Sequence, residues 1–288
     1  MSSTPNSPIF IGGCGRSGTT LVVDVLGLHP RISPIYETDF VMPIAVMLAK
    51  RTPLPQVIAR VRSLMDQWTA PLPHRPHNKR AHERYVHGPH HILFDRDFAM
   101  EQTEAFITQL EAGAGLMALR GFMDALFDRH SALDNKPRWA NKTPAYVHVL
   151  PVLHHLYPDM TFVHCVRDGR DVACSVVTRP WGPSTYVEAA RWWSGKVMDG
   201  LRFAQQHPQR HVTLRYEDLL SNPESELERV LARIGETNVG AIIDAYRTSG
   251  QTFQGARTGG WKDRFSTSDR TDFARTAGPL LEHLGYAA

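Results

Sequence analysis

Short apolar runs alternate with longer segments of helical periodicity along this chain. Four runs have the length and residue content of buried strands, at residues 9–11, 138–140, 161–166 and 212–214. A helical pattern separates each run from the next, which is the order of elements in a parallel sheet with helices on both faces. The pattern therefore predicts an α/β fold, with one domain over residues 1–288 because no linker divides the chain.

Two helices stand out in this pattern. Residues 19–28 are predicted to form a helix directly after the first strand. Residues 223–234 give the clearest helix. Asn222 stands at its capping position, Pro223 at its first position and Gly235 directly after it. Its apolar stripe indicates a structural role: Leu227, Val230, Leu231 and Ile234.

Residues 40–136 are predicted to be a mainly helical insertion. Apolar residues repeat at helical spacing over 57–68 and again over 106–110. Between them, residues 71–91 are dense in Pro, His, Arg and Asn, which we interpret as a long loop or lid. Because ligands of open α/β sheets bind at the carboxyl ends of the strands, the insertion is expected to overhang the site.

Composition narrows the class of protein. A formal charge of +3 is too small to indicate nucleic-acid binding. Arginine supplies 26 of the 32 basic residues, and guanidinium groups suit bidentate contacts with phosphate or sulfate. The longest apolar run, residues 41–49, is too short to span a bilayer and contains Pro43. Together with a polar N-terminus, these features predict a cytoplasmic protein with no membrane span.

Cysteine and histidine usage predicts neither a disulfide nor a metal site. Cys14, Cys165 and Cys174 have no CxxC neighbour, as is typical of a reducing compartment. Six of the 15 histidines fall in the 71–91 segment, but their spacing matches no closed zinc set. We interpret them as solvated: His74, His77, His82, His87, His90 and His91.

Residues 8–20, PIFIGGCGRSGTT, read as a buried strand that runs into a glycine-rich loop and a helix. Such a loop directs backbone N–H groups and a helix N-terminus at one anion. When the loop is aligned on Gly13 and Gly18 with the NTPase phosphate loop, the lysine position is occupied by Thr19. The loop therefore favours a 5′-phosphate over a triphosphate.

A second anion site is predicted after the third strand. Arg167 stands at the strand end, Ser175 follows eight residues later, and Arg179 comes a further four residues on, about one helical turn from Ser175. These three side chains can converge on one phosphate. The alternative is that Arg167 only pairs with Asp168 at the strand end. Two phosphate-type sites in one sheet indicate a nucleotide with anions at two separate positions.

The ordered set of motifs resembles the sulfotransferases that use 3′-phosphoadenosine 5′-phosphosulfate (PAPS). GCGRSGTTLVVDVLGLHP resembles their 5′-phosphosulfate loop and VRDGRDVACS their 3′-phosphate motif, and YETDF, WANKTP, LRYEDLLSNPE and GGWKDRFS extend the likeness. The set is more similar to the tyrosylprotein and bacterial branches than to the cytosolic phenol and steroid branch. Residues 41–135 match no motif. The resemblance implies a P-loop-type three-layer fold, with a central parallel β-sheet flanked by helices and a helical insertion that binds the acceptor over the active site.

The resemblance also implies which residues bind the nucleotide. The 5′-phosphosulfate would be held by Gly15, Arg16, Ser17, Gly18, Thr19 and Thr20. The 3′-phosphate would be bound by Arg167 and Ser175, with Arg179 as a further nucleotide contact and Tyr216 against the adenosine. The closing loop would contribute Arg257, Trp261, Lys262 and Arg264, although it lacks the Arg-Lys-Gly triplet of the cytosolic branch.

For the chemistry, the resemblance implies in-line sulfuryl transfer to a hydroxyl, or secondarily an amine. Glu37 matches the general base, while Lys142 and Arg16 would stabilise the leaving phosphate, so that no metal is needed. Taken without the resemblance, Glu37 is an exposed loop carboxylate or a helix cap, Lys142 is a loop lysine, and Tyr216 is an aromatic at the core edge.

Other side chains remain open as alternatives. His148, His154 and His155 are possible bases if Glu37 points away, whereas His164 is interpreted as a hydrogen-bonded core residue. Trp192 and Trp193 are assigned to the core.

Two competing functions are a P-loop phosphotransferase and a non-catalytic sensor of adenosine nucleotides. Thr19 and the lack of an acidic pair after a strand argue against the first. The expected partners are PAPS, its product 3′-phosphoadenosine 5′-phosphate (PAP) and a hydroxyl-bearing acceptor, with no nucleic acid. The sequence leaves the acceptor and the oligomeric state open.

Overall fold

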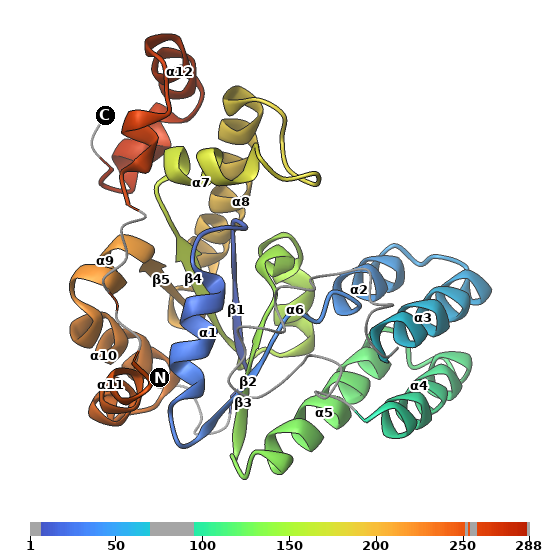
Figure 1. Cartoon of the computed structure of the whole chain (residues 1–288). Coiled ribbons are helices and arrows are strands. Elements are labelled where there is room, and N and C mark those ends of the chain that lie inside the picture. Colours follow the sequence, from blue (N-terminus) through green and yellow to red (C-terminus); the bar gives the residue numbers. More distant parts are fainter. Residues whose placement is uncertain (1–6, 70–94, 251–252, 254–257, 287–288) are drawn as a thin grey trace.

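Five parallel strands form the central sheet, in the order β2-β3-β1-β4-β5 (Figure 1). The computed structural model describes residues 7–69, 95–250, 253 and 258–286. The parallel α/β fold is confirmed, and the four predicted strands are present, three of them longer than predicted. The strands are β1 (Ile9–Gly13), β2 (Ile32–Ile35), β3 (Arg138–Lys142), β4 (Thr161–Val166) and β5 (His211–Arg215).

The apolar pattern fails to predict β2. Its sequence, ISPI, has four residues and includes Pro34, which cannot donate a ladder hydrogen bond. β2 lies at the edge of the sheet beside β3, where a proline is tolerated. Pro34 also packs closely on the preceding helix, because a Cβ at Gly27 would lie 2.7 Å from Pro34 Cγ.

Alternate strand residues face opposite sides of the sheet. Ile9, Ile11 and Val163 pack on one side, which is covered by α1 (Thr19–Gly27), α10 (Pro223–Ile234) and α11 (Val239–Thr248). The prediction for α10 is confirmed at both ends, and Gly235 ends it with a φ of 77°. Asn222 stands at the N-cap position, but its side chain makes no capping hydrogen bond.

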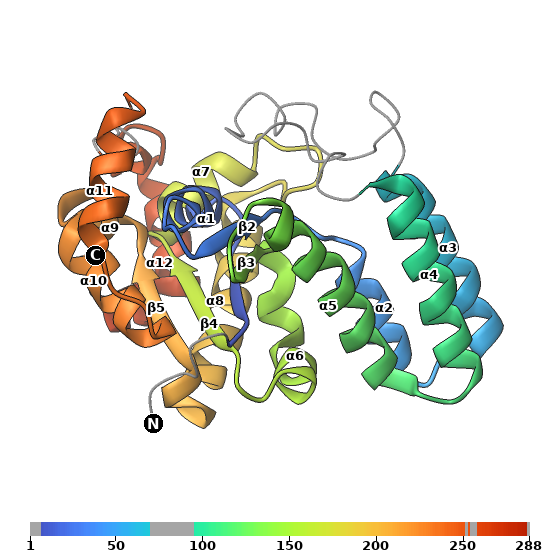
Figure 2. The same ribbon diagram turned by 90° about the horizontal axis from the view of Figure 1, so that it is seen from below.

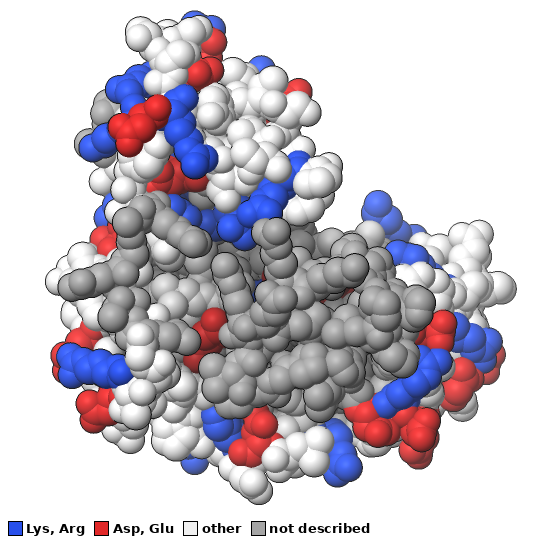
Figure 3. Space-filling view, in the orientation of Figure 1, with Lys and Arg blue, Asp and Glu red and all other residues white. Residues whose placement is uncertain are grey.

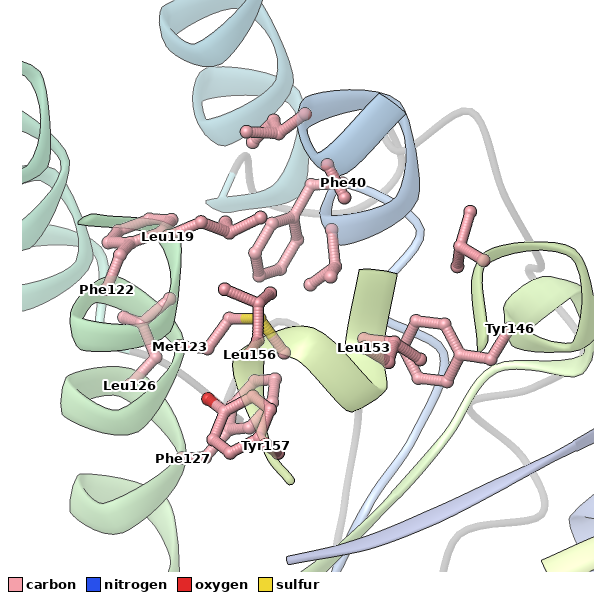
Figure 4. Packing of buried hydrophobic residues seen from close by; sticks show 14 of the residues in the cluster. Phe40, Leu119, Phe122, Met123, Leu126, Phe127, Tyr146, Leu153, Leu156 and Tyr157 are labelled. Carbon is pink, nitrogen blue, oxygen red and sulfur yellow. The ribbon is translucent and has the colours of Figure 1, made fainter. Parts of the chain in front are cut away.

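The other side of the sheet carries the largest core cluster (Figure 4). Phe10 of β1 lies at its centre, where its ring meets Trp139 and Tyr146 edge-on with centroids 5.5 Å apart in each pair. Three elements supply the surrounding side chains: α5 (Gly115–Leu133), the 3₁₀ helix η2 (Pro144–Val149) and α6 (Leu150–Leu156).

The predicted insertion is mainly helical in the parts that the structure describes. The segments 57–68 and 106–110 lie in α3 (Leu54–Thr69) and α4 (Arg96–Glu111), which pack through α2 (Val41–Ala49) and α5 against the sheet side that carries Phe10 (Figure 2). The histidine-rich segment 71–91 lies outside the described residues, so its role as a lid stays a prediction. No helix within the described ranges is both long and apolar enough to cross a membrane.

A third cluster builds the region beyond the carboxyl end of β4. It joins α7 (Gly169–Val176), α8 (Tyr186–Gln206), the 3₁₀ helix η4 (Gly260–Asp263) and α12 (Thr267–His283). Trp193 is fully buried there, as predicted for a core residue. Trp192 is half-buried and packs against this cluster. The remaining short elements are α9 (Tyr216–Ser221) and the 3₁₀ helix η3 (Pro208–Arg210).

His164 departs from its prediction as a hydrogen-bonded core residue. It is fully buried, but neither ring nitrogen has a hydrogen-bond partner within the described part of the chain. The ring instead packs against α8, where a Cβ on Gly200 would lie 2.2 Å from His164 Cε1. Burial lowers the pKa of His164 to about 3, with a smaller contribution from His211. His164 is therefore neutral in the folded protein.

Candidate functional site

The phosphate-type loop joins β1 to α1 and depends on two glycines. Gly13 has a φ of 148°, and a Cβ there would lie 2.2 Å from the carbonyl oxygen of Cys165 on the neighbouring strand. Gly18 has a φ of 85°, and a Cβ there would lie 2.4 Å from the ring of Tyr216. Both glycines are therefore required by backbone conformation and by close approach.

The start of α1 offers donors to an anion. Gly18 is its N-cap residue, and no side chain caps the helix. The first N–H groups of a helix have no intrahelical acceptor, so those that follow Gly18 are available to a bound phosphate. The buried hydroxyl of Ser17 also has no partner among the described residues. Thr19 and Thr20 begin the helix, with Thr19 buried and Thr20 half-buried.

The two anion motifs, far apart in the sequence, meet directly. Arg16 Nε donates to Ser175 Oγ on α7 at 2.9 Å. Arg167 Nη1 donates to the carbonyl oxygen of Arg16 at 3.3 Å. β1 and β4 are neighbours in the sheet, which places the two loops side by side. Figure 3 shows Lys and Arg side chains gathered where α7 and the loop before α1 lie in Figure 1.

Arg167 does not simply pair with Asp168. Asp168 is the N-cap residue of α7, and its carboxylate pairs with Arg170 at 2.9 Å. The Arg167 guanidinium lies 4.7 Å above the Tyr216 ring and 3.8 Å from the Asp171 carboxylate. Tyr216 thus lies between Gly18 of the phosphate-type loop and Arg167 of the second motif.

Arg179 follows α7 and is half-buried. Its buried Nε has no hydrogen-bond partner among the described residues.

The C-terminal segment is fixed to α7 through Asp171. The Asp171 carboxylate accepts from the backbone N–H of Gly259 at 2.7 Å and of Trp261 at 3.0 Å. The Trp261 ring is buried and contacts two guanidinium groups, with Arg170 at 3.9 Å and Arg270 at 5.3 Å from its centroid. These contacts hold η4 beside the second anion motif.

The predicted closing-loop cations differ in where they lie. Arg264 Nη1 donates to the carbonyl oxygen of Cys174, the residue before Ser175, at 3.3 Å. Lys262 is exposed, and Arg257 lies outside the described residues. Of the described pair, Arg264 is the one with a side-chain hydrogen bond to α7.

Glu37 and Lys142 come together at the carboxyl ends of β2 and β3. Lys142 is the last residue of β3, and Glu37 follows β2 by two residues. Lys142 Nζ donates to Glu37 Oε1 at 2.6 Å; the lysine side chain is fully buried and the glutamate side chain is 29% exposed. Glu37 is not a helix cap, because α2 begins at Val41 after Phe40.

A buried network of polar side chains lies next to this ion pair. The hydroxyl of Thr38 donates to Asn141 Oδ1 at 3.0 Å and contacts the Tyr146 hydroxyl at 2.7 Å. The backbone N–H of Thr38 donates to Thr143 Oγ1 at 3.1 Å. The residues that follow Glu37 and Lys142 are thereby tied to each other across the two strands.

A group of side chains from α8 and η2 lies beside the phosphate loop, and sequence reasoning did not predict it. A Cβ at Gly15 would lie 3.4 Å from Trp192 Cη2. Lys196, one turn further along α8, lies 4.8 Å from the Trp192 ring centroid and 2.7 Å from His148 Nε2. His148 Nδ1 lies 2.9 Å from the Asp199 carboxylate. The four-residue spacing of Trp192 and Lys196 predicts one helix face, but only the fold brings that face to Gly15.

The alternative bases are placed differently. His148 is held between Asp199 and Lys196, whereas His154 packs against His207 with ring centroids 4.0 Å apart. His155 is exposed on α6. Among the residues that the structure describes, no three His, Cys, Asp or Glu side chains are grouped as metal ligands.

Residues 8–238 match the sequence profile of the sulfotransferase family, which is most of the chain. The chain belongs to the sulfotransferase family. Its fold agrees, because a sulfotransferase domain from the Synechococcus PCC 7002 olefin synthase covers the whole chain with a TM-score of 0.60 at 18% identity, and 97% of that domain is matched. A sulfotransferase domain from the curacin biosynthetic pathway covers 99% of this chain and of its own length, with a TM-score of 0.55 at 17% identity.

Relatives that are similar in sequence to this chain carry names that refer to different processes. Protein-tyrosine sulfotransferase A of Caenorhabditis elegans is 22% identical over 77% of this chain and 48% of its own length. The nodulation protein NoeE of Sinorhizobium fredii is 29% identical over 43% of this chain and 35% of its own length. The chain thus spans half or less of these two relatives. The family match and the solved structures thus agree on the family and the fold.

Proposed function

We propose that this sulfotransferase moves a sulfuryl group from PAPS to a hydroxyl, or secondarily an amine, of an acceptor. The contact between Arg16 Nε and Ser175 Oγ carries the proposal, because it joins the two anion motifs into one site. A nucleotide with a 5′-phosphosulfate and a 3′-phosphate has anions for both motifs. PAPS supplies the sulfuryl group and a phosphate leaving group when bound.

The residues present fit this nucleotide. The glycine cradle at Gly13 and Gly18 leaves the N-terminus of α1 open to a 5′ anion. Arg167 and Ser175, with Arg179 beside them, would hold the 3′-phosphate, and the Tyr216 ring would contact the adenosine. Arg264 and Trp261 would close the site from the C-terminal side.

The Glu37–Lys142 pair would carry out the proton and charge chemistry. Glu37 accepts the proton of the acceptor hydroxyl as the oxygen–sulfur bond forms. The bond between sulfur and the bridging phosphate oxygen breaks, and its electron pair goes to that oxygen. Lys142 donates a hydrogen bond to the oxygen as its charge grows, so the products are a sulfate ester and PAP.

The acceptor would be selected by the insertion of residues 40–136. α2 begins four residues after Glu37 and packs on η2, which begins two residues after Lys142, so the first helix of the insertion lies close to both residues of the pair along the chain. A tyrosine peptide is the first acceptor to test, because relatives are named protein-tyrosine sulfotransferases.

Labelled PAPS, a panel of acceptors and EDTA test this proposal. We expect label to pass to at least one of a tyrosine peptide, a sugar, a lipid headgroup analogue or a small phenol, with EDTA making no difference. ATP turnover that requires Mg²⁺ would instead show a phosphotransferase. Tight binding of PAP without transfer to any of a broad set of acceptors would show a nucleotide sensor.

A further inference from the structure

Lys196 lies beside the phosphate loop and next to η2. The sheet order puts β3, with Lys142 at its end, on one side of β1, and β4 and β5, which lead to Arg167 and Tyr216, on the other. Lys196 bonds to His148 of η2, which follows β3, and its helix face meets Gly15 through Trp192. Its ammonium is therefore held next to η2, the 3₁₀ helix that follows Lys142.

The cations already named at this loop are directed elsewhere. Arg16 turns to Ser175 on the far side of β1, and the position of the usual loop lysine is Thr19. Lys142 is held by the Glu37 carboxylate at 2.6 Å. In-line transfer nevertheless places the negatively charged sulfuryl oxygens between the loop and the acceptor.

Lys196 is suited to that charge. It has no carboxylate within 4.0 Å among the described residues, although it is partly buried. Burial lowers the pKa of the Lys196 ammonium, and the nearby Cys14 and Asp199 oppose this effect, which agrees with its place beside the loop. An ammonium in such surroundings gains more from an anionic ligand than an exposed one does.

We infer that Lys196 binds the sulfuryl oxygens of the donor, in the place that the absent loop lysine leaves open. This inference rests on the proposed function. His148 and Asp199 act as positioning residues: the Asp199 carboxylate accepts from Nδ1–H of His148, which leaves Nε2 to accept one proton of the Lys196 ammonium. The other protons of the ammonium remain for the ligand, while the Trp192 ring supports the charge.

Binding of PAPS and PAP, measured by calorimetry without acceptor, tests the inference. Because PAP lacks the sulfuryl group, Lys196→Met is expected to weaken PAPS binding by about ten- to a hundredfold and PAP binding by less than about threefold. Retained PAP binding also reports that the variant is folded. Arg191→Met, which removes an exposed cation from the same helix, serves as the matched control and should change neither.

Equal losses for both nucleotides, or no loss for either, would overturn the role of Lys196. So would a variant that binds PAPS normally and shows only a raised KM for the acceptor. Wild-type protein that binds neither nucleotide would instead overturn the proposed function. His148→Phe is expected to weaken PAPS binding in the wild type but to add nothing to Lys196→Met, and additive losses would exclude the positioning role.

Discussion

At the scale of single residues, the contacts between motifs describe the candidate site better than the motifs taken one by one. The sequence predicts Arg16 beside the leaving phosphate and Ser175 at a separate 3′ site. The structure joins their side chains at 2.9 Å, which makes Arg16 a bridge between the sites. Glu37 and Lys142, which a sequence without family context leaves as loop residues, form a half-buried ion pair.

Arg167→Ala is expected to weaken PAP binding by about 1.5 to 3 kcal/mol, the range for hydrogen bonds to charged groups. Calorimetric titration with PAP measures the change. Arg275→Ala, which removes an exposed guanidinium paired only with Asp272 in the described residues, is the control. An unchanged affinity in Arg167→Ala would refute its assignment to the 3′-phosphate.

Glu37→Gln is expected to lower kcat by about 10²- to 10⁴-fold, as loss of a general base does. The amide oxygen can still accept from Lys142, so PAP affinity should stay within about twofold. Steady-state kinetics and PAP titration of the same preparation separate the two effects. Parallel losses in rate and nucleotide affinity would show that Glu37 only maintains the structure of the site.

At the scale of elements, sequence periodicity predicts long or well-capped segments and fails where tertiary contacts decide. α10 is predicted at both ends, because Pro223 and Gly235 mark it locally. β2 is not, because a four-residue strand with Pro34 is stabilised by its neighbour β3 and not by its own propensity. The contact between Trp192 and Gly15 escapes prediction for a related reason, since the two residues are far apart in the sequence.

The attachment of η4 to α7 gives a prediction at this scale. Asp171→Ala removes the acceptor of two backbone N–H groups, those of Gly259 and Trp261, and should loosen the segment that carries Arg264. Hydrogen exchange measured by mass spectrometry is expected to rise over residues 258–264. Asp171→Asn keeps one acceptor oxygen and should show a smaller rise; protection equal to the wild type in both variants would contradict the attachment.

At the scale of the whole molecule, the strand order places the proposed donor contacts and the proposed acceptor-binding insertion on opposite sides of β1. β4 and β5 lead to the predicted nucleotide contacts, while β2 and β3 lead to Glu37, Lys142 and the helical insertion. The sequence allows specific residues to be proposed for the first group, because they lie in short local motifs. For the insertion, the sequence predicts helices and nothing about the acceptor. Its apolar residues pack in a core, and core packing does not depend on which acceptor is bound.

Stability should depend on pH through two buried histidines. Burial lowers the pKa of His164 to about 3 and of His211 to about 4, both below the ordinary value of 6.5. Below pH 6.5 the unfolded chain therefore binds protons that the folded protein does not, and stability falls on acidification by at most about 1.4 kcal/mol per pH unit for each histidine.

Urea unfolding between pH 7.5 and 5 measures this dependence. The double variant His164→Asn and His211→Asn lacks both titrating groups and should show a flatter profile, whatever its stability at pH 7.5. A profile as steep as that of the wild type would assign the effect to other groups.

Cys14 is fully buried, within the loop between β1 and α1, and burial raises the pKa of its thiol. A maleimide can therefore reach it only when the loop opens. The rate at which maleimide labels Cys14 Sγ therefore measures how often the loop opens. Mass spectrometry distinguishes this label from labels on Cys165 and Cys174. We expect bound PAP to lower the labelling rate of Cys14, because a ligand in the loop would favour its closed state. A labelling rate that PAP leaves unaltered would mean that the nucleotide binds without restricting the opening of the loop.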